Sequence, residues 1–177
     1  ILLFFNLSYF NVYSIEPDVF IQSTVNRASE TLSKNISKQE KINELKFIAK
    51  ETVDIKGIGF YSLGSNRKNL NDNQKKKYFD LFENYFLKSF SSRLAEYTDP
   101  KIQVQSKKIL NKNYTIVNSV LASTSNRLQI KIDWRVYTKN PDNPLIRDLI
   151  IEGLSLAVAQ RAEFASILNS NDGDINA

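Results

Sequence analysis

The chain has 177 residues and a formal net charge of +5, and its hydrophobic (42%) and charged (24%) fractions are ordinary for a globular protein. It contains no cysteine and no histidine, which excludes disulfides, Cys/His zinc sites and Ser-His or Cys-His catalytic pairs within one copy of the chain. Carboxylate, lysine and tyrosine chemistry remain possible, and the length is sufficient for one domain with a substantial core.

The basic residues do not have the composition that is typical of nucleic-acid binding. Lysine supplies 17 of the 24 basic residues, and 19 acidic residues are interspersed with them. Proteins that bind nucleic acids depend instead on arginine forks and on continuous basic stripes. The run Lys75, Lys76 and Lys77 fits a solvated helix face, or a transient contact with a membrane surface or an acidic partner. We therefore expect no nucleic-acid partner.

The amino-terminal segment, residues 1–14, carries no charge. Val12 and Ser14 are acceptable at the third and first positions before an export cleavage site. We expect 1–14 to be the remnant of a signal peptide, and Ile15 to begin a single mature domain over 15–177. The alternative is a membrane anchor, but a span needs about 20 apolar residues and this segment has polar interruptions. These interruptions are Asn6, Ser8 and Asn11.

Helical periodicity dominates the chain before Pro100. A first amphipathic helix is predicted over 17–34, with a proline in its first turn. A capping box opens a second helix over 37–53, and the glycine-containing segment 54–64 predicts a short helical turn. The longest helix is predicted over 71–97, with a second capping box formed by Asn71 and Gln74 at its start and an Asp-Pro pair that ends it.

The apolar face of this longest helix is strongly aromatic. Large side chains recur at intervals of three and four residues, while charged residues occupy the other side. Such a stripe either lines a ligand cavity or fills a solid core, and periodicity does not decide between the two. The residues of the stripe are Phe79, Phe82, Phe86, Phe90, Leu94 and Tyr97.

After Pro100 the hydrophobic period changes from about 3.6 to 2 residues, which predicts strands. We expect strands near 101–109, 113–123, 127–138 and 144–152, followed by a helix over 154–168. The turns between the strands are short, so the strands are expected to pair as an antiparallel meander. The predicted fold class is therefore α+β, with a twisted four-stranded antiparallel sheet wrapped by helices.

The third predicted strand has one apolar and one polar face. Trp134 lies on the apolar face, and Asp133 and Arg135 lie on the polar one. The aromatic stripe and the apolar side of the sheet together predict an apolar pocket. Its candidate lining residues are Phe79, Phe82, Phe86, Phe90, Val104, Ile116, Val120, Ile130, Ile132, Trp134 and Val136.

Arg161 stands within the apolar face of the last predicted helix and therefore needs a partner. Asp148 and Glu152 share one face of the preceding strand, so either is expected to pair with Arg161 and hold the helix on the sheet. The alternative is that Arg161 binds a phosphate or carboxylate of a ligand through its guanidinium fork.

Two segments of the chain carry a resemblance to a known family. YFDLFENYFLKSFSSRLAEY, residues 78–97, resembles the aromatic helix of the MlaC family of periplasmic phospholipid carriers. DLIIEGLSLAVAQRAEFASIL, residues 148–168, is similar to that family's carboxy-terminal signature, with Arg161 and Phe164 three residues apart. The chain departs from the family pattern at Gln160, where tyrosine is frequent, and in the segment NPLIRDL, which lacks a tryptophan.

The resemblance implies a carrier with no catalytic role and no cofactor or metal. It implies transfer of one phospholipid through the periplasm, between an outer-membrane lipoprotein complex and an inner-membrane ABC transporter, in a sheet wrapped by helices around an apolar cavity. Each buried methylene is worth about 0.8 kcal/mol, so two acyl chains of about fifteen methylenes represent more than about 20 kcal/mol of exposure cost. A carrier must therefore shield the chains from water.

Two other classes of function remain open from the residues. One is a small enzyme of a cone-shaped α+β fold that uses Asp133 as its base, although Asp133 lies between Lys131 and Arg135 on the polar face. Ser155 lacks a histidine base and is better explained as a helix cap. The other class is a protein-binding adaptor, which would have a filled core.

Overall fold

The computed structural model of the protein describes residues 14–125 and 128–175, so the predicted signal segment lies almost wholly outside the described residues. No helix in the described part of the chain combines the length and the apolar character that a membrane span requires. The elements in chain order are α1 (Pro17–Ser33), α2 (Lys38–Thr52), α3 (Ile55–Leu63), the 3-10 helix η1 (Gly64–Asn69), α4 (Asp72–Leu94), β1 (Ile102–Asn111), β2 (Tyr114–Leu121), β3 (Ile130–Tyr137), β4 (Leu145–Ile151), β5 (Leu154–Ser155) and α5 (Leu156–Ser170).

The strands form one antiparallel sheet in the order β1-β2-β3-β4-β5, which confirms the meander. The sheet has five strands rather than the four expected, because Leu154–Ser155 turns back and pairs with the end of β4. A two-residue turn makes this reversal, and both of its residues, Glu152 (φ 49°) and Gly153 (φ 83°), have positive φ. Positive φ at both positions is the geometry of a tight hairpin, whereas the sequence pattern assigned Leu154 to the following helix.

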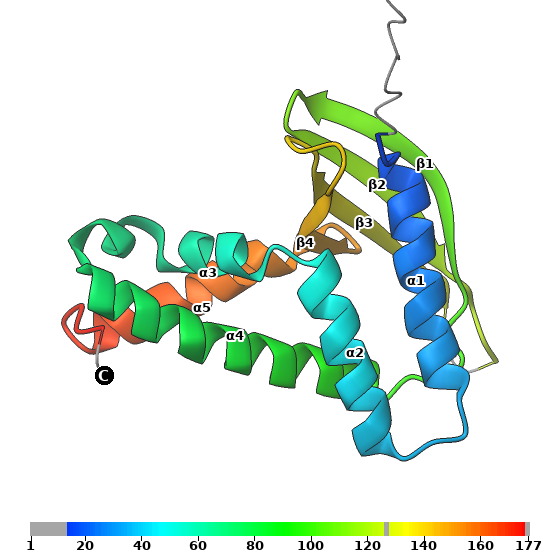
Figure 1. Cartoon of the computed structure of the whole chain (residues 1–177), viewed down its shortest axis with the longest axis horizontal. Helices are drawn as coiled ribbons and strands as arrows, with labels where there is room; N and C mark the ends of the chain where they lie inside the picture. Colours follow the sequence, from blue (N-terminus) through cyan, green and yellow to red (C-terminus); the bar gives the residue numbers. More distant parts are fainter. Residues whose placement is uncertain (1–13, 126–127, 176–177) are drawn as a thin grey trace, which may run out of the picture.

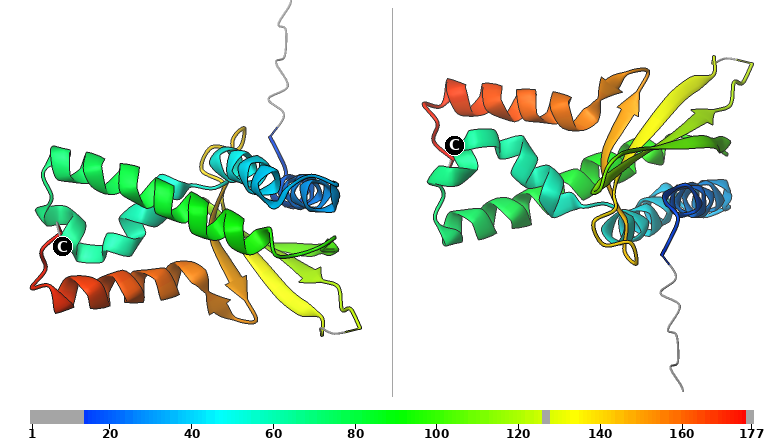
Figure 2. Two further views of the ribbon diagram at one scale, coloured as in Figure 1. Left: turned by 90° about the horizontal axis from the view of Figure 1, so that it is seen from below. Right: turned by 90° about the horizontal axis from the view of Figure 1, so that it is seen from above.

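The helices divide between two places around the sheet. Figure 1 shows α1 and α2 side by side over one side of the sheet. Helices α3 and α5 and the first half of α4 form an arm that projects beyond the sheet, and the two turned views in Figure 2 show the same arrangement. The second half of α4 returns toward the sheet and contacts α2.

Local side-chain bonds explain where the helices begin. Capping boxes open α2 at Ser37 and α4 at Asn71, in agreement with the sequence analysis. Asp54 caps α3 by accepting a hydrogen bond from the main-chain N–H of Gly57, and Ser155 caps α5 as expected. Each cap satisfies an N–H group that the first helical turn leaves without an intrahelical partner.

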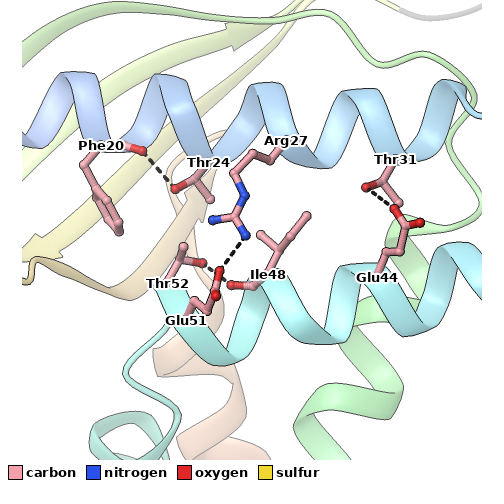
Figure 3. Close-up of polar contacts among 8 residues, drawn as sticks. All are labelled: Phe20, Thr24, Arg27, Thr31, Glu44, Ile48, Glu51 and Thr52. Atoms are coloured by element: carbon pink, nitrogen blue, oxygen red, sulfur yellow. Dashed lines mark hydrogen bonds and ion pairs between the residues drawn. The ribbon is translucent and has the colours of Figure 1, made fainter.

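Polar contacts between their side chains join α1 and α2 into a pair (Figure 3). Arg27 forms an ion pair with Glu51 at 2.5 Å, and the Thr31 hydroxyl donates to Glu44 at 3.0 Å. The Arg27–Glu51 pair is more than 40% exposed on both sides, so it orients the helices more than it stabilises them. The stabilising contribution comes from the apolar faces that α1 and α2 turn toward the sheet, with Ile21, Val25 and Ala49 almost fully buried.

Candidate functional site

A cavity of about 140 Å³ lies inside the fold, between the α1–α2 pair, the second half of α4 and the apolar face of the sheet. We call it the core cavity. None of the described residues that line it is charged. Its principal lining residues are Val25, Ala28 and Leu32 of α1, Leu45, Ile48 and Ala49 of α2, Phe90 and Leu94 of α4, Tyr97 after α4, and Ile132, Trp134, Ile146, Leu149 and Ile151 of the sheet.

Three of the hydroxyl groups in the wall bond to the main chain. Three lining residues donate hydrogen bonds to carbonyl oxygens at 2.8–2.9 Å, and two of these bonds join a threonine to the residue four positions earlier in its own helix. A hydroxyl that already donates to a carbonyl oxygen does not need a hydrogen-bond acceptor from a ligand. The wall therefore offers a ligand mainly carbon atoms. The three bonds run from Thr24 to Phe20, from Thr52 to Ile48 and from Ser29 to Pro100.

Trp134 is held in the cavity wall through its single polar atom. Its indole Nε1–H donates to the Ser119 hydroxyl at 2.9 Å, and that hydroxyl donates to the Ile132 carbonyl at 3.0 Å. Ser119 is therefore a positioning residue that the sequence analysis missed. The β2–β3 register, which places Ser119 opposite Ile132, brings the two strands together here. With its N–H satisfied, Trp134 presents its apolar surface to the cavity.

The candidate lining residues fall into distinct groups in the structure. Phe90, Ile132 and Trp134 line the core cavity. Phe79 lies farther away, between α3 and α4, with its ring edge-to-face on Phe60 at 4.2 Å. The others near the cavity belong to the surrounding core: Phe82 and Val136 are buried in it, and Phe86, Val104 and Ile130 pack against it.

Ile116 and Val120 lie outside the core cavity, contrary to the sequence analysis. Val117 is the residue of β2 that pairs with Trp134 of β3. Side chains alternate along a strand, so the even-numbered residues of β2 point to the other face of the sheet. Both alternate sets of β2 contain apolar and polar residues, so the sequence pattern did not reveal which set faces the helices.

The lining residues from α1 and α2 were absent from the candidate set. Their helical periodicity predicted a buried face on each helix, but not the surface against which that face packs. Long-range contacts decide this, because α1 contacts β1 and β2, and α2 contacts α4. The paired helices therefore form one whole wall of the core cavity.

A model of the MlaC protein family matches residues 22–177 of the chain. The chain belongs to the MlaC family. A curated relative, the intermembrane phospholipid transport system binding protein MlaC of Haemophilus influenzae, is 25% identical over 166 residues, which are 89% of this chain and 77% of the relative. The fold is similar to that of the phospholipid-binding protein from Ralstonia solanacearum, solved in complex with a phospholipid. That structure has a TM-score of 0.76 and 17% identity, and the match covers 92% of each chain.

In this member of the MlaC family the last helix is attached to the sheet through Asp148, but not through Arg161. Asp148 is 3% exposed and accepts hydrogen bonds from the Ser155 hydroxyl at 2.6 Å and the Ala157 N–H at 3.0 Å. Its ion-pair partner is Arg135, at 3.8 Å. The expected pairing of Arg161 with Asp148 was therefore wrong.

The remaining predicted partner of Arg161 is also engaged elsewhere. Glu152 accepts a hydrogen bond from the main-chain N–H of Lys131. The exposed guanidinium of Arg161 lies over the ring of Tyr61, 5.0 Å from its centroid. The reason is geometric, since Arg161 follows the cap Ser155 by more than one helical turn and α5 runs away from the sheet (Figure 1).

The carboxylate proposed as a base does not face the core cavity. Asp133 accepts a hydrogen bond from the Asn118 amide at 2.8 Å. It alternates with Ile132 and Trp134 along β3, so it points to the opposite face of the sheet. Within the described residues no group of His, Cys, Asp and Glu is arranged to hold a metal ion.

Tyr78 links the aromatic core to the arm of the MlaC fold. Its hydroxyl donates to the carbonyl oxygen of Gly59 at 3.1 Å, and its ring stacks on Phe82 with centroids 5.8 Å apart. Burial raises the pKa of Tyr78 above its ordinary value of 10.0. The folded protein thus keeps this proton at pH values where the unfolded chain has lost it.

We expect this difference between the pKa of Tyr78 in the folded and the unfolded protein to lower the free energy of unfolding at alkaline pH. The contribution of Tyr78 is fully present below about pH 10, where both states hold the proton, and falls as the pH rises above that value. Urea unfolding between about pH 9 and 11 is expected to show a shallower loss of stability in Tyr78→Phe than in the wild type. Tyr85→Phe, at a 42% exposed position, should keep the wild-type pH dependence. Equal slopes in Tyr78→Phe and the wild type would contradict the expectation.

Proposed function

We propose that this protein is a periplasmic phospholipid-binding shuttle, which carries a lipid between transport complexes of the outer and inner membranes and thereby helps to maintain lipid asymmetry of the outer membrane. The proposal includes export by a signal peptide and no catalytic step. The observation that carries it is the core cavity, with its uncharged walls and main-chain-bonded hydroxyls. The names of the Haemophilus relative and of the Ralstonia neighbour support phospholipid as the ligand.

The chemistry of the cavity favours acyl chains over polar ligands. Burial of apolar surface stabilises a complex by about 25 cal/mol per Å². The hydrophobic effect is non-directional, so an acyl chain gains this free energy without a particular orientation in the cavity. A polar ligand of the same size would lose its hydrogen bonds to water and find few replacements in the wall. The headgroup is therefore expected to stay outside, where water solvates it, and the protein is expected to accept several headgroup classes.

The core cavity is smaller than a complete lipid requires. A volume of about 140 Å³ is close to that of an engineered cavity of about 150 Å³ that binds benzene. Pockets for larger ligands have volumes of about 300–1,000 Å³. Entry of two acyl chains therefore requires the walls to separate. The side on which α4 approaches the sheet is suited to this, because Phe90, Leu94 and Leu149 line the cavity there and are only partly buried.

The test is to express the protein with an export signal, purify it from the periplasm without detergent, and extract it with organic solvent. Mass spectrometry is expected to find about one phospholipid per protein. Lipid-free protein should regain lipid from phospholipid vesicles and deliver it to acceptor vesicles. A protein that carries no lipid after purification and takes up none from vesicles would contradict the proposal.

The alternative functions receive less support from the structure. Asp133 points away from the core cavity, so it is not placed to act as a base on a molecule bound there. An adaptor needs no internal space, whereas the described part of this chain contains an apolar cavity. Docking to membrane complexes remains part of the shuttle proposal, with the exposed lysines at the start of α4 as candidate contacts.

A further inference from the structure

A second, larger pocket of about 330 Å³ lies at the junction of α3, α5 and the sheet. We call it the arginine pocket. Arg135 lines it from β3, on the face opposite Trp134, and Arg147 lines it from β4. Tyr114, Asp148 and the apolar residues Ile58, Leu110 and Val158 complete the principal walls. The arginine pocket is thus separated from the core cavity by the sheet.

The carboxylates beside the arginine pocket are already occupied by internal donors. Asp148 accepts from the Ser155 hydroxyl and the Ala157 N–H, as described above. Asp54 accepts from the Gly57 N–H at 2.8 Å and from Nε of Arg147 at 2.6 Å. Asp54 is the cap of α3, and Asp148 accepts an N–H from the first turn of α5, so both carboxylates are held in place by these internal donors.

The guanidinium of Arg135, in contrast, has an N–H donor without an acceptor in the described part of the chain. Its Nε is buried and forms no hydrogen bond with any described residue. Its Nη1 lies 3.8 Å from Asp148 Oδ2, a distance that allows attraction but is too long for a hydrogen bond. A buried donor left without a partner costs free energy, and a bound ion is one of its ordinary explanations.

Arg147 and Tyr114 add a second, preorganised donor set. Arg147 Nη1 donates to the Tyr114 hydroxyl oxygen at 2.6 Å, which leaves the phenolic proton available to another acceptor. The Arg147 guanidinium also lies over the Tyr137 ring, 3.8 Å from its centroid. These contacts fix its position, so little conformational entropy is lost when a ligand binds.

We infer that the arginine pocket binds a phosphate-type oxyanion, with Arg135 and the Tyr114 hydroxyl as its principal donors. A guanidinium presents two parallel N–H groups that match two oxygens of a phosphate, which a lysine does not. The apolar walls at Leu110 and Val158 admit carbon atoms beside the phosphate, as in a phosphate ester. Two kinds of ligand carry such a phosphate group: inorganic phosphate, and a lipid headgroup detached from its acyl chains.

The test uses the purified, ¹⁵N-labelled protein at low ionic strength. One arm adds inorganic phosphate, and the other adds the tail-free phosphodiester glycerophosphoglycerol. The Nε–H resonance of Arg135 is assigned by its loss in Arg135→Gln and is expected to shift saturably. Calorimetry should show that Arg135→Gln and Arg135→Lys bind the anion at least about tenfold more weakly than the wild type. The reason is that each variant loses a hydrogen bond to a charged group, whose free energy corresponds to about that factor. Arg93→Gln, at an exposed position in the last turn of α4, should bind as the wild type does.

The outcomes separate the possible sources of the anion. A shift with both probes supports the shared site, a shift with phosphate alone assigns it to the free ion, and a shift with the diester alone assigns it to a headgroup. No shift of Arg135 with either probe, or equal affinities in the wild type and Arg135→Gln, would overturn the inference. Because the sheet lies between the two pockets, Arg135→Gln should keep its copurified phospholipid, so this test and that of the shuttle proposal fail independently.

Discussion

Ala28→Phe is expected to remove phospholipid from the purified protein. Ala28 lines the core cavity from α1, where a larger side chain enters space that is already present. The lipid-free protein should therefore fold as the wild type does, whereas an acyl chain and the new ring would compete for one volume. Overpacking costs about 1–3 kcal/mol, and about 1.4 kcal/mol is a tenfold change in affinity. We expect bound lipid to fall about tenfold or more, measured by mass spectrometry of solvent extracts.

The matched control for this cavity-filling change is Ala165→Phe. Ala165 is exposed on α5 and does not line the core cavity, so the same chemical change there should leave the lipid content unaltered. Thermal unfolding of both variants distinguishes loss of binding from loss of folding. A well-folded Ala28→Phe protein with wild-type lipid content would show that the chains bind elsewhere.

Asp148→Ala is expected to be the most destabilising of the single substitutions considered for this fold. The side chain of Asp148 is 1% exposed, and it joins the cap of α5 to β4 while facing Arg135. Its removal leaves the Ser155 hydroxyl and the Ala157 N–H without their acceptor and takes away the carboxylate that faces Arg135. A hydrogen bond to a charged group is worth about 1.5–3 kcal/mol, so the loss of both bonds corresponds to a fall in Tm of about 10 °C for a protein of this size.

Urea and thermal unfolding measure this effect. Asp142→Ala, at an exposed position in the turn between β3 and β4, removes the same charge and should change stability by less than about 0.5 kcal/mol. Asp148→Asn keeps the shape of the side chain and one oxygen acceptor, so an intermediate loss is expected. If Asp148→Ala were as stable as Asp142→Ala, the attachment of α5 would have to come from its other contacts.

Features that depend on neighbouring residues were predictable from the sequence. The capping boxes at Ser37 and Asn71 and the cap at Ser155 were all placed correctly, because each requires only residues within one helical turn. The apolar stripe of α4 was likewise visible, and Phe82 and Phe90 are in the core or the cavity wall. Short turns between the strands were enough to predict antiparallel neighbours.

Features that depend on pairing between distant segments were not predictable in the same way. The sequence placed Ile116 in the cavity wall, but the pairing of Val117 with Trp134 turns Ile116 to the other face. Arg161 was expected to pair with Asp148 or Glu152 because a charge on an apolar face needs a partner, yet the direction of α5 takes it to the ring of Tyr61. In both cases the position of the side chain is decided by how segments distant in the chain pack together.

By itself, the sequence of this protein determined an α+β chain without cysteine or histidine chemistry, the caps of α2, α4 and α5, and the antiparallel order of β1 to β4, because these follow from composition, periodicity and bonds between near neighbours. Only the tertiary structure decided that α1 and α2 supply a whole cavity wall, and that Arg135 and Arg147 meet at one pocket. The physical reason is that strand register and helix direction are set by the packing of surfaces far apart in the chain, where a shift of one residue exchanges the two faces of a strand.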